Sequence, residues 1–183
     1  FKDIGAGLEG VAFCDLSWND FDNDGDLDLT VSGATATSSH TKIYKNTDGR
    51  FADTGIILAP MVFASLDWGD FDNDGDDDLV LSGGKYGPGL LSGATKLYRN
   101  DGGVFSEMAV GFPGAFSGKT VWTDYDNDGD LDVLIIGGET AITNPRARVM
   151  ENLGGGSFRP AINLIGAMLT AVGIGDLDGD ADT

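Results

Sequence analysis

The stretch W-N-D-F-D-N-D-G-D-L-D-L, from Trp18 to Leu29, decides the fold because the chain repeats it. It recurs as W-G-D-F-D-N-D-G-D-D-D-L from Trp68 and as W-T-D-Y-D-N-D-G-D-L-D-V from Trp122, and a weaker copy, I-G-D-L-D-G-D-A-D-T, begins at Ile174. The copies are spaced by 50, 54 and 52 residues, measured at their first aspartates: Asp20, Asp70, Asp124 and Asp176. The chain is therefore a tandem repeat of units of about 50 residues.

Each unit carries the signals for four short strands. The first strand ends at the tryptophan, and the aspartate stretch follows as a loop. The second strand is an apolar run at Leu27–Ser32, Leu79–Ser82 or Leu131–Ile136. The third contains Tyr44, Tyr98 or Met150, and a glycine turn leads to a fourth at Phe51, Phe105 or Phe158. The nearly continuous apolar second strands are typical of strands buried on both faces.

Repeated four-stranded sheets of this length are typical of a β-propeller, whose blades bury each other's faces. The sequence therefore predicts an all-β chain of four-stranded antiparallel blades, with about three and a half blades present. We expect the trailing strand of a preceding blade at 1–8, blades at 9–56, 57–110 and 111–163, and the start of another at 164–183. Because propellers have about 4–8 blades, we expect a longer polypeptide, with completion by another chain as the alternative.

The aspartate loop has the pattern D-x-D-x-D-G-x-x-D, which predicts a calcium site. Calcium takes 6–8 oxygen ligands in a flexible shell, whereas magnesium demands a strict octahedron, and the absence of His and Cys from the loops argues against zinc. An EF-hand would need a glutamate at position twelve, where this chain has Val31, Leu81 or Ile135. At the seventh position (Asp26, Asp76, Asp130) we expect the backbone carbonyl to bind the ion and the carboxylate to face water.

We expect about one calcium ion per loop: three with full loops, and a fourth in the weaker copy, where Ala181 replaces the loop glycine. The predicted metal-binding residues are Asp20, Asp22, Asp24, Asp26, Asp28, Asp70, Asp72, Asp74, Asp76, Asp78, Asp124, Asp126, Asp128, Asp130, Asp132, Asp176, Asp178, Asp180 and Asp182. No other cofactor is expected.

The net charge of −19, with only 11 Lys and Arg, argues against a nucleic-acid or anionic-membrane surface. Twenty of the 30 acidic residues lie in the four loops, so most of the acidity belongs to the predicted sites. No apolar run approaches the ~20 residues of a membrane helix. We therefore expect neither nucleic-acid binding nor membrane insertion.

The cysteine, the tryptophans and the histidine are expected to have structural rather than catalytic or ligand-binding roles. Cys14 is the only cysteine, which rules out an intrachain disulfide, and we expect it to be a small buried hydrophobe. Trp18, Trp68 and Trp122 are expected in the core between blades rather than as platforms for sugars. His40 is the only histidine and lies in a polar stretch, so no catalytic triad can be built around it. The sequence predicts no enzymatic activity.

The repeated aspartate loops, with their in-phase K-I-Y-K-N and K-L-Y-R-N strands, resemble the FG-GAP/VCBS repeat family, which includes the propeller of integrin alpha subunits. The resemblance covers essentially the whole chain. It implies that the calcium loops join the first and second strands of each blade, away from the ligand-binding face, with a mainly structural role.

The expected function is that of an extracellular or cell-surface module for adhesion or for binding a protein or glycan. The repeats differ most in the loops at Ala34–His40, Gly84–Ala94 and Gly138–Pro145, opposite the calcium loops. Candidate ligand contacts lie in the longest of these loops: Lys85, Tyr86, Leu90 and Leu91. The extracellular location is inferred from calcium sites with affinities near ~10⁻⁴–10⁻³ M. The alternatives are a non-catalytic accessory domain of a secreted hydrolytic enzyme and an architectural repeat of a surface filament or assembly.

Overall fold

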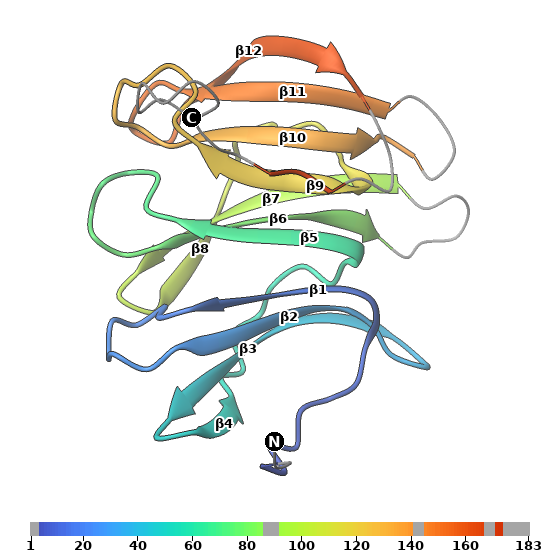
Figure 1. The fold of residues 1–183 in the computed structure, drawn as a ribbon, viewed down its shortest axis with the longest axis vertical. Coiled ribbons are helices and arrows are strands. Elements are labelled where there is room, and N and C mark those ends of the chain that lie inside the picture. Colours follow the sequence, from blue (N-terminus) through green and yellow to red (C-terminus); the bar gives the residue numbers. More distant parts are fainter. Residues whose placement is uncertain (1–3, 86–91, 141–144, 167–170, 174–183) are drawn as a thin grey trace.

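The computed structural model describes residues 4–85, 92–140, 145–166 and 171–173. These residues form three four-stranded antiparallel sheets, stacked in sequence order (Figure 1). The first sheet contains β1 (Ala12–Asn19), β2 (Asp28–Ala34), β3 (Ser39–Thr47) and β4 (Arg50–Asp53). The second contains β5 (Val62–Gly69), β6 (Asp78–Lys85), β7 (Ser92–Asp101) and β8 (Val104–Met108). The third contains β9 (Phe116–Thr123), β10 (Asp132–Gly138), β11 (Pro145–Asn152) and β12 (Phe158–Ile165).

Each sheet is an up-and-down meander, and the three share one register. Trp18 pairs with Leu29 and Leu29 with Tyr44 in the first sheet. The residues at the equivalent positions of the repeat pair in the same way in the other two sheets. The all-β fold of propeller-type blades is thus confirmed. A trailing strand was expected at residues 1–8. Residues 4–11 form no strand, so the described part of that segment, residues 4–8, is not a strand. None of the described residues forms a helix long and apolar enough to cross a membrane.

Two apolar cores lie between consecutive blades. The first combines Ile43 of one blade with Leu66, Leu79, Leu81 and Tyr98 of the next, together with other buried residues. An aromatic residue from each of the first two aspartate loops joins the core with the following blade: the ring centroids of Phe21 and Phe105 are 5.9 Å apart. Phe71 of the second loop stacks on Trp122, with ring centroids 5.9 Å apart and planes 4° apart. The loop motif therefore contributes directly to blade packing as well as to its own site.

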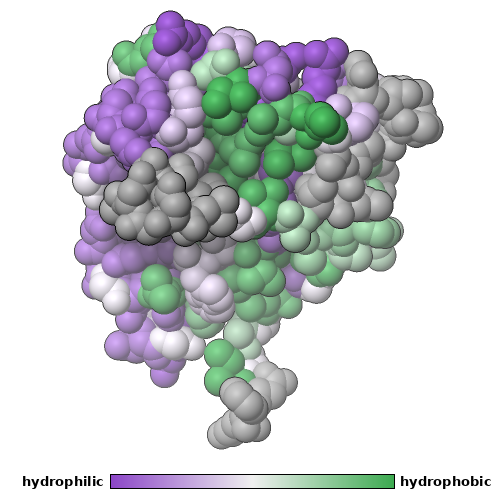
Figure 2. Space-filling model, turned by 45° about the horizontal axis from the view of Figure 1, so that its top comes forward, coloured by the Kyte–Doolittle hydropathy of each residue, from purple (hydrophilic) through white to green (hydrophobic). Residues whose placement is uncertain are grey.

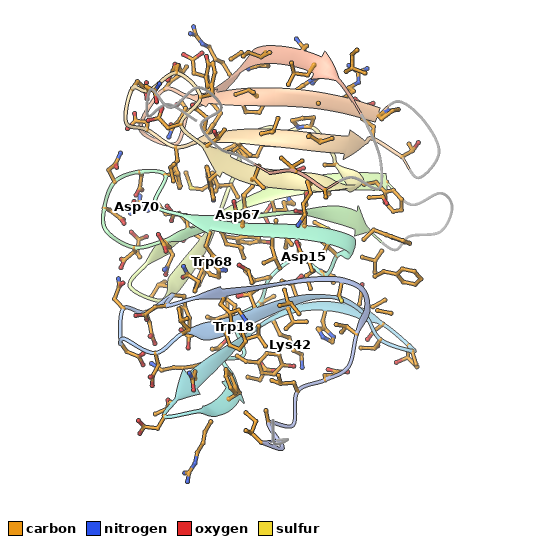
Figure 3. All side chains as sticks on the ribbon, viewed as in Figure 1. Asp15, Trp18, Lys42, Asp67, Trp68 and Asp70 are labelled. Carbon is orange, nitrogen blue, oxygen red and sulfur yellow. The ribbon has the colours of Figure 1, made fainter. Side chains whose placement is uncertain are left out.

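Polar side chains connect the neighbouring inner strands β1, β5 and β9. Asp15 accepts a hydrogen bond from the Leu66 backbone at 3.2 Å and one from the Lys119 ammonium at 2.9 Å. Asp67 accepts one from the Trp122 backbone at 2.9 Å. Both carboxylates lie on the inner strands in Figure 3. A carboxylate that accepts a backbone N–H hydrogen bond thus joins β1 to β5, and another joins β5 to β9.

The first blade has one face that no other described blade covers. Leu16 is 54% exposed, whereas its counterpart Leu66 is 5% exposed. Trp18 is 51% exposed and Trp122 only 7%, so the expected core position holds for Trp122 and not for Trp18. Cys14 is also exposed, contrary to the expectation of a buried thiol, because no described segment packs over this part of β1.

Candidate metal centres

The aspartate loops share one backbone conformation, which their own side chains hold. In the first loop Asp20 accepts hydrogen bonds from the backbone of Asp24 at 3.0 Å and of Gly25 at 2.8 Å. Asp24 in turn accepts one from the Asp26 backbone at 3.0 Å. Gly25 has φ +93°, in the region that disfavours a side chain. The second and third loops repeat the same bonds within 0.2 Å, so the sequence repeat produces a repeat of geometry.

In each loop three carboxylates converge. One oxygen from each of the first, third and ninth residues lies within 4.8 Å of the other two, and these triads are Asp20, Asp22 and Asp28; Asp70, Asp72 and Asp78; and Asp124, Asp126 and Asp132. The ninth residue begins the second strand and is at most 1% exposed in all three blades. Its oxygens accept backbone hydrogen bonds from inside the loop and from the third strand, for example from Phe21 at 3.3 Å and from Asn46 at 2.7 Å.

The triads fit a hard divalent cation. Burial raises the pKa of Asp78 to about 7 and that of Asp132 to about 6, and it raises the pKa of Asp28 as well. In two loops one oxygen of the third residue, Oδ1 of Asp22 and of Asp72, is buried without a hydrogen-bond partner. Clustered, partly desolvated carboxylate oxygens of this kind are ligands that calcium prefers, and a bound ion would remove their mutual repulsion.

The remaining loop aspartates lie outside these triads. Asp24, Asp74 and Asp128 are exposed and accept the backbone hydrogen bond of the seventh residue. The seventh carboxylates do not simply face water, as expected, because they accept hydrogen bonds from neighbouring segments. Asp26 accepts one from the Asp48 backbone at 3.0 Å, and Asp76 accepts one from the Asn23 amide at 2.8 Å. Asp130 accepts one from the Asn73 amide at 2.9 Å. The side chains at this position therefore connect loops and strands.

An asparagine at the same position of the third strand in all three blades supports the loops, a role that the sequence alone did not reveal. The Asn100 amide donates to the Asp77 carbonyl at 3.1 Å, within its own blade, and to the Phe21 carbonyl at 2.8 Å, in the preceding blade. Asn152 makes the equivalent pair of bonds to Leu131 and Phe71. The signal was its in-phase recurrence at the end of K-I-Y-K-N, K-L-Y-R-N and R-V-M-E-N.

Other predicted residues lie elsewhere. The fourth loop, with Asp176, Asp178, Asp180 and Asp182, lies outside the described residues, as do Tyr86, Leu90 and Leu91. Lys85 ends β6 and is exposed. His40 lies in β3, with Nδ1 3.7 Å from Glu9, rather than in an irregular loop. Figure 2 shows hydrophilic residues gathered along the left side, the side of the aspartate loops in Figure 1.

Comparison with known families agrees with this geometry. A family model described as FG-GAP-like repeat matches residues 20–81 and 124–183, about two thirds of the chain. The chain belongs to this FG-GAP-like repeat family. The two matched segments contain all four aspartate loops of the sequence, and each begins at the first aspartate of a loop. No curated protein matches the chain. The three blades are accordingly called FG-GAP blades below.

Proposed function

We propose that this FG-GAP chain is a calcium-stabilised propeller segment that serves as an extracellular or cell-surface module for adhesion or for binding a protein or glycan. The observation that supports it best is the threefold recurrence of one carboxylate triad at the same edge of three stacked blades. The module itself is non-catalytic in this proposal, and calcium has a structural role.

The structural role follows from what the ligands connect. Asp20 and Asp22 belong to the loop, whereas Asp28 is the first residue of β2 and holds the backbone of Asn46 in β3. Bound there, calcium would neutralise the clustered carboxylates. The loop would then be fixed against the second and third strands, and with it the aromatic side chain of Phe21, which packs on the following blade. Ion binding would in this way stabilise both a blade and its contact with the next.

The ligand surface in this proposal lies at the opposite edge, in the loops between the second and third strands. These loops differ in length and composition among the blades, whereas the aspartate loops are nearly identical. Variable loops on a rigid scaffold are the usual place for recognition. The extracellular location is supported by the number of calcium sites, because millimolar calcium saturates even weak sites.

The uncovered face of the first blade supports membership of a longer chain or an assembly. Asn46 is the counterpart of Asn100, but among the described residues its amide donates only within its own blade, to the Leu27 carbonyl at 3.0 Å. A further FG-GAP blade against Leu16 and Trp18 would present a loop carbonyl to this amide, as Phe21 does to Asn100. The same observation keeps the architectural alternative, a repeat in a surface filament, as a second candidate.

Calcium titration followed by native mass spectrometry and thermal unfolding tests the proposal. We expect at least three bound ions and a melting temperature that falls when calcium is chelated. Asp22→Asn, Asp72→Asn and Asp126→Asn should each remove one ion. Asp53→Asn, which changes an exposed carboxylate paired with Lys42 outside the loops, should remove none. A melting temperature that does not respond to calcium would refute the structural role.

A screen of glycans and extracellular-matrix proteins, in calcium and in chelator, tests the binding role. We expect a ligand that needs calcium and whose binding falls when Gly84–Ala94 is replaced by the shorter Ala34–His40 sequence. The same exchange should leave the number of bound calcium ions unchanged, because the aspartate loops lie at the other edge. Binding that survives the exchange would place recognition elsewhere, and the absence of any ligand would favour the architectural alternative.

A further inference from the structure

One position beside the calcium loops differs in charge from blade to blade. It precedes the supporting asparagine in the third strand, and it is Lys45 in the first blade, Arg99 in the second and Glu151 in the third. The flanking strand register is the same in all three blades, because Tyr44, Tyr98 and Met150 pair with equivalent residues of the second strand. The three loops therefore face different charges in otherwise matched surroundings.

In the first blade the basic side chain lies directly on the loop. The Lys45 ammonium forms an ion pair with Asp22, a member of the triad, and lies 2.9 Å from Asp24 Oδ2. It therefore competes with a metal ion for the Asp22 carboxylate. Lysine is flexible and monovalent, so a divalent ion can displace it, but the lost contact weakens the apparent affinity for the ion.

In the second blade the contact is looser. Arg99 Nε lies 3.4 Å from Asp72 Oδ2, and the same guanidinium also forms an ion pair with the exposed Asp101. The second loop has an additional carboxylate at Asp77, which accepts a hydrogen bond from Asn19 at 2.6 Å. The opposition to a bound ion is smaller here than in the first blade, because Arg99 lies farther from the triad and is shared with a residue outside the loop.

In the third blade the position holds a carboxylate. Glu151 accepts a hydrogen bond from the hydroxyl of Tyr125, a residue of the loop itself, at 3.2 Å. Its ion pair is with Arg159 of β12, whose Nη2 lies 2.6 Å from Oε1. The arginine partly offsets the charge of Glu151, and the side chain at this position contributes no competing cation to the triad.

We propose that this third-strand position sets the order in which the loops bind calcium, with the third loop filling first, the second next and the first last. The inference rests on the calcium binding proposed above and adds its regulation. When calcium falls, the first loop releases its ion before the others, and the first blade loosens first. One variable position in the third strand thus gives different calcium affinities to three sites that have equivalent aspartate ligands.

Site-resolved calcium titration of the whole chain by amide NMR tests the order. The loop glycines Gly25, Gly75 and Gly129 serve as reporters, because each donates its backbone N–H to the first aspartate of its own loop. We expect the Gly129 signal to reach its midpoint at the lowest calcium concentration and the Gly25 signal at the highest. Lys45→Gln should lower the Gly25 midpoint roughly twofold to fivefold, the range expected for one partly exposed ion pair, and leave the Gly129 midpoint unchanged.

Lys42→Gln is the matched control, because it removes the same charge from the same strand while Lys42 pairs with Glu9 and Asp53 rather than with the loop. Glu151→Lys is the converse variant and should raise the Gly129 midpoint. Equal midpoints at all three glycines, or equal shifts in Lys45→Gln and Lys42→Gln, would overturn the inference. If no glycine responded to calcium, the proposed function itself would fail. Amide dispersion in the same spectra reports whether each variant is folded.

Discussion

Asn100 illustrates how much one side chain can hold in a repeat of this kind. It is fully buried, and its amide donates to carbonyls of two different blades while its oxygen accepts from Gly103 at 2.8 Å. Its backbone N–H donates to Asp78, a residue of the second triad, at 2.8 Å. One residue therefore couples a carboxylate triad, a glycine turn and a blade boundary.

Asn100→Ala should destabilise the chain by about 2–3 kcal/mol, because it leaves two buried carbonyls without donors and each costs roughly 1 kcal/mol or more. Urea unfolding in saturating calcium measures the loss. Asn46→Ala is the control: Asn46 is only partly buried and makes no bond to another described blade, so the loss should be about 1 kcal/mol. Equal losses would show that the cross-blade bond contributes nothing.

Gly75→Val tests the backbone of the second loop. Gly75 has φ +94° and open space where a side chain would stand, so the cost is conformational strain, about 1–3 kcal/mol. We expect the loss of one calcium ion as well, since the Gly75 N–H donates to Asp70. Gly10→Val is the control, because Gly10 also has open space and no positive φ. Ion counts from native mass spectrometry that match the parent would contradict the expectation.

At the scale of the elements, the inner strands β1, β5 and β9 are joined by carboxylates whose surroundings differ. Burial raises the pKa of Asp67, and hydrogen bonds from the Trp122 and Trp68 backbones and the charge of Lys119 only partly offset this. Asp53, on the outer strand β4, behaves in the opposite way: hydrogen bonds from Gly55 and Lys42 lower its pKa.

Asp67→Asn should therefore stabilise the chain at pH 7. The raised pKa means that the ionised carboxylate costs stability above its folded pKa, and this cost disappears as the pH falls through that value. The gain in melting temperature should be largest at neutral pH and shrink toward pH 4. Asp53→Asn should show the opposite sign, a loss at neutral pH that shrinks in acid. Parallel melting curves of variant and parent across this range would contradict the assignment.

Much of this element structure could be predicted from sequence, and the reason is the repeat. Matching glycines and aspartates in three units specify the loops and the strand order. The start of each first strand could not be predicted: Phe13, Phe63 and Ser117 adopt positive φ of 48–53° there. Two of these residues are phenylalanine and one is serine, and phenylalanine disfavours this conformation, so tertiary packing overrides local preference. The exposure of Cys14 was missed for a related reason, since burial depends on which blades are adjacent.

At the scale of the whole molecule, the three blades differ in what covers them. Trp122 is packed against Phe71 of the preceding blade, whereas Trp18 has one aromatic neighbour among the described residues, Phe51 of its own blade, with ring centroids 5.8 Å apart. The sequence repeat makes the two tryptophans equivalent, and only their place in the stack separates them.

Trp122→Ala should cost about 3–5 kcal/mol, as for other buried tryptophans, whereas Trp18→Ala should cost about 1 kcal/mol or less in the chain of 183 residues. Urea unfolding of the two variants gives the comparison. An equally large loss for Trp18→Ala would mean that the face is covered in solution. Sedimentation of the parent chain would then show whether a second copy covers it.

The bonds between neighbouring loops have a mechanical consequence. Asn23 donates to Asp76 across the first blade boundary, and Asn73 donates to Asp130 across the second. Hydrogen bonds between neighbouring loops therefore connect the acidic edge of the stack along the direction in which the blades are stacked. A pulling force along this direction is shared between these two links and the apolar cores, so the stack also resists tension at the edge farthest from its variable loops.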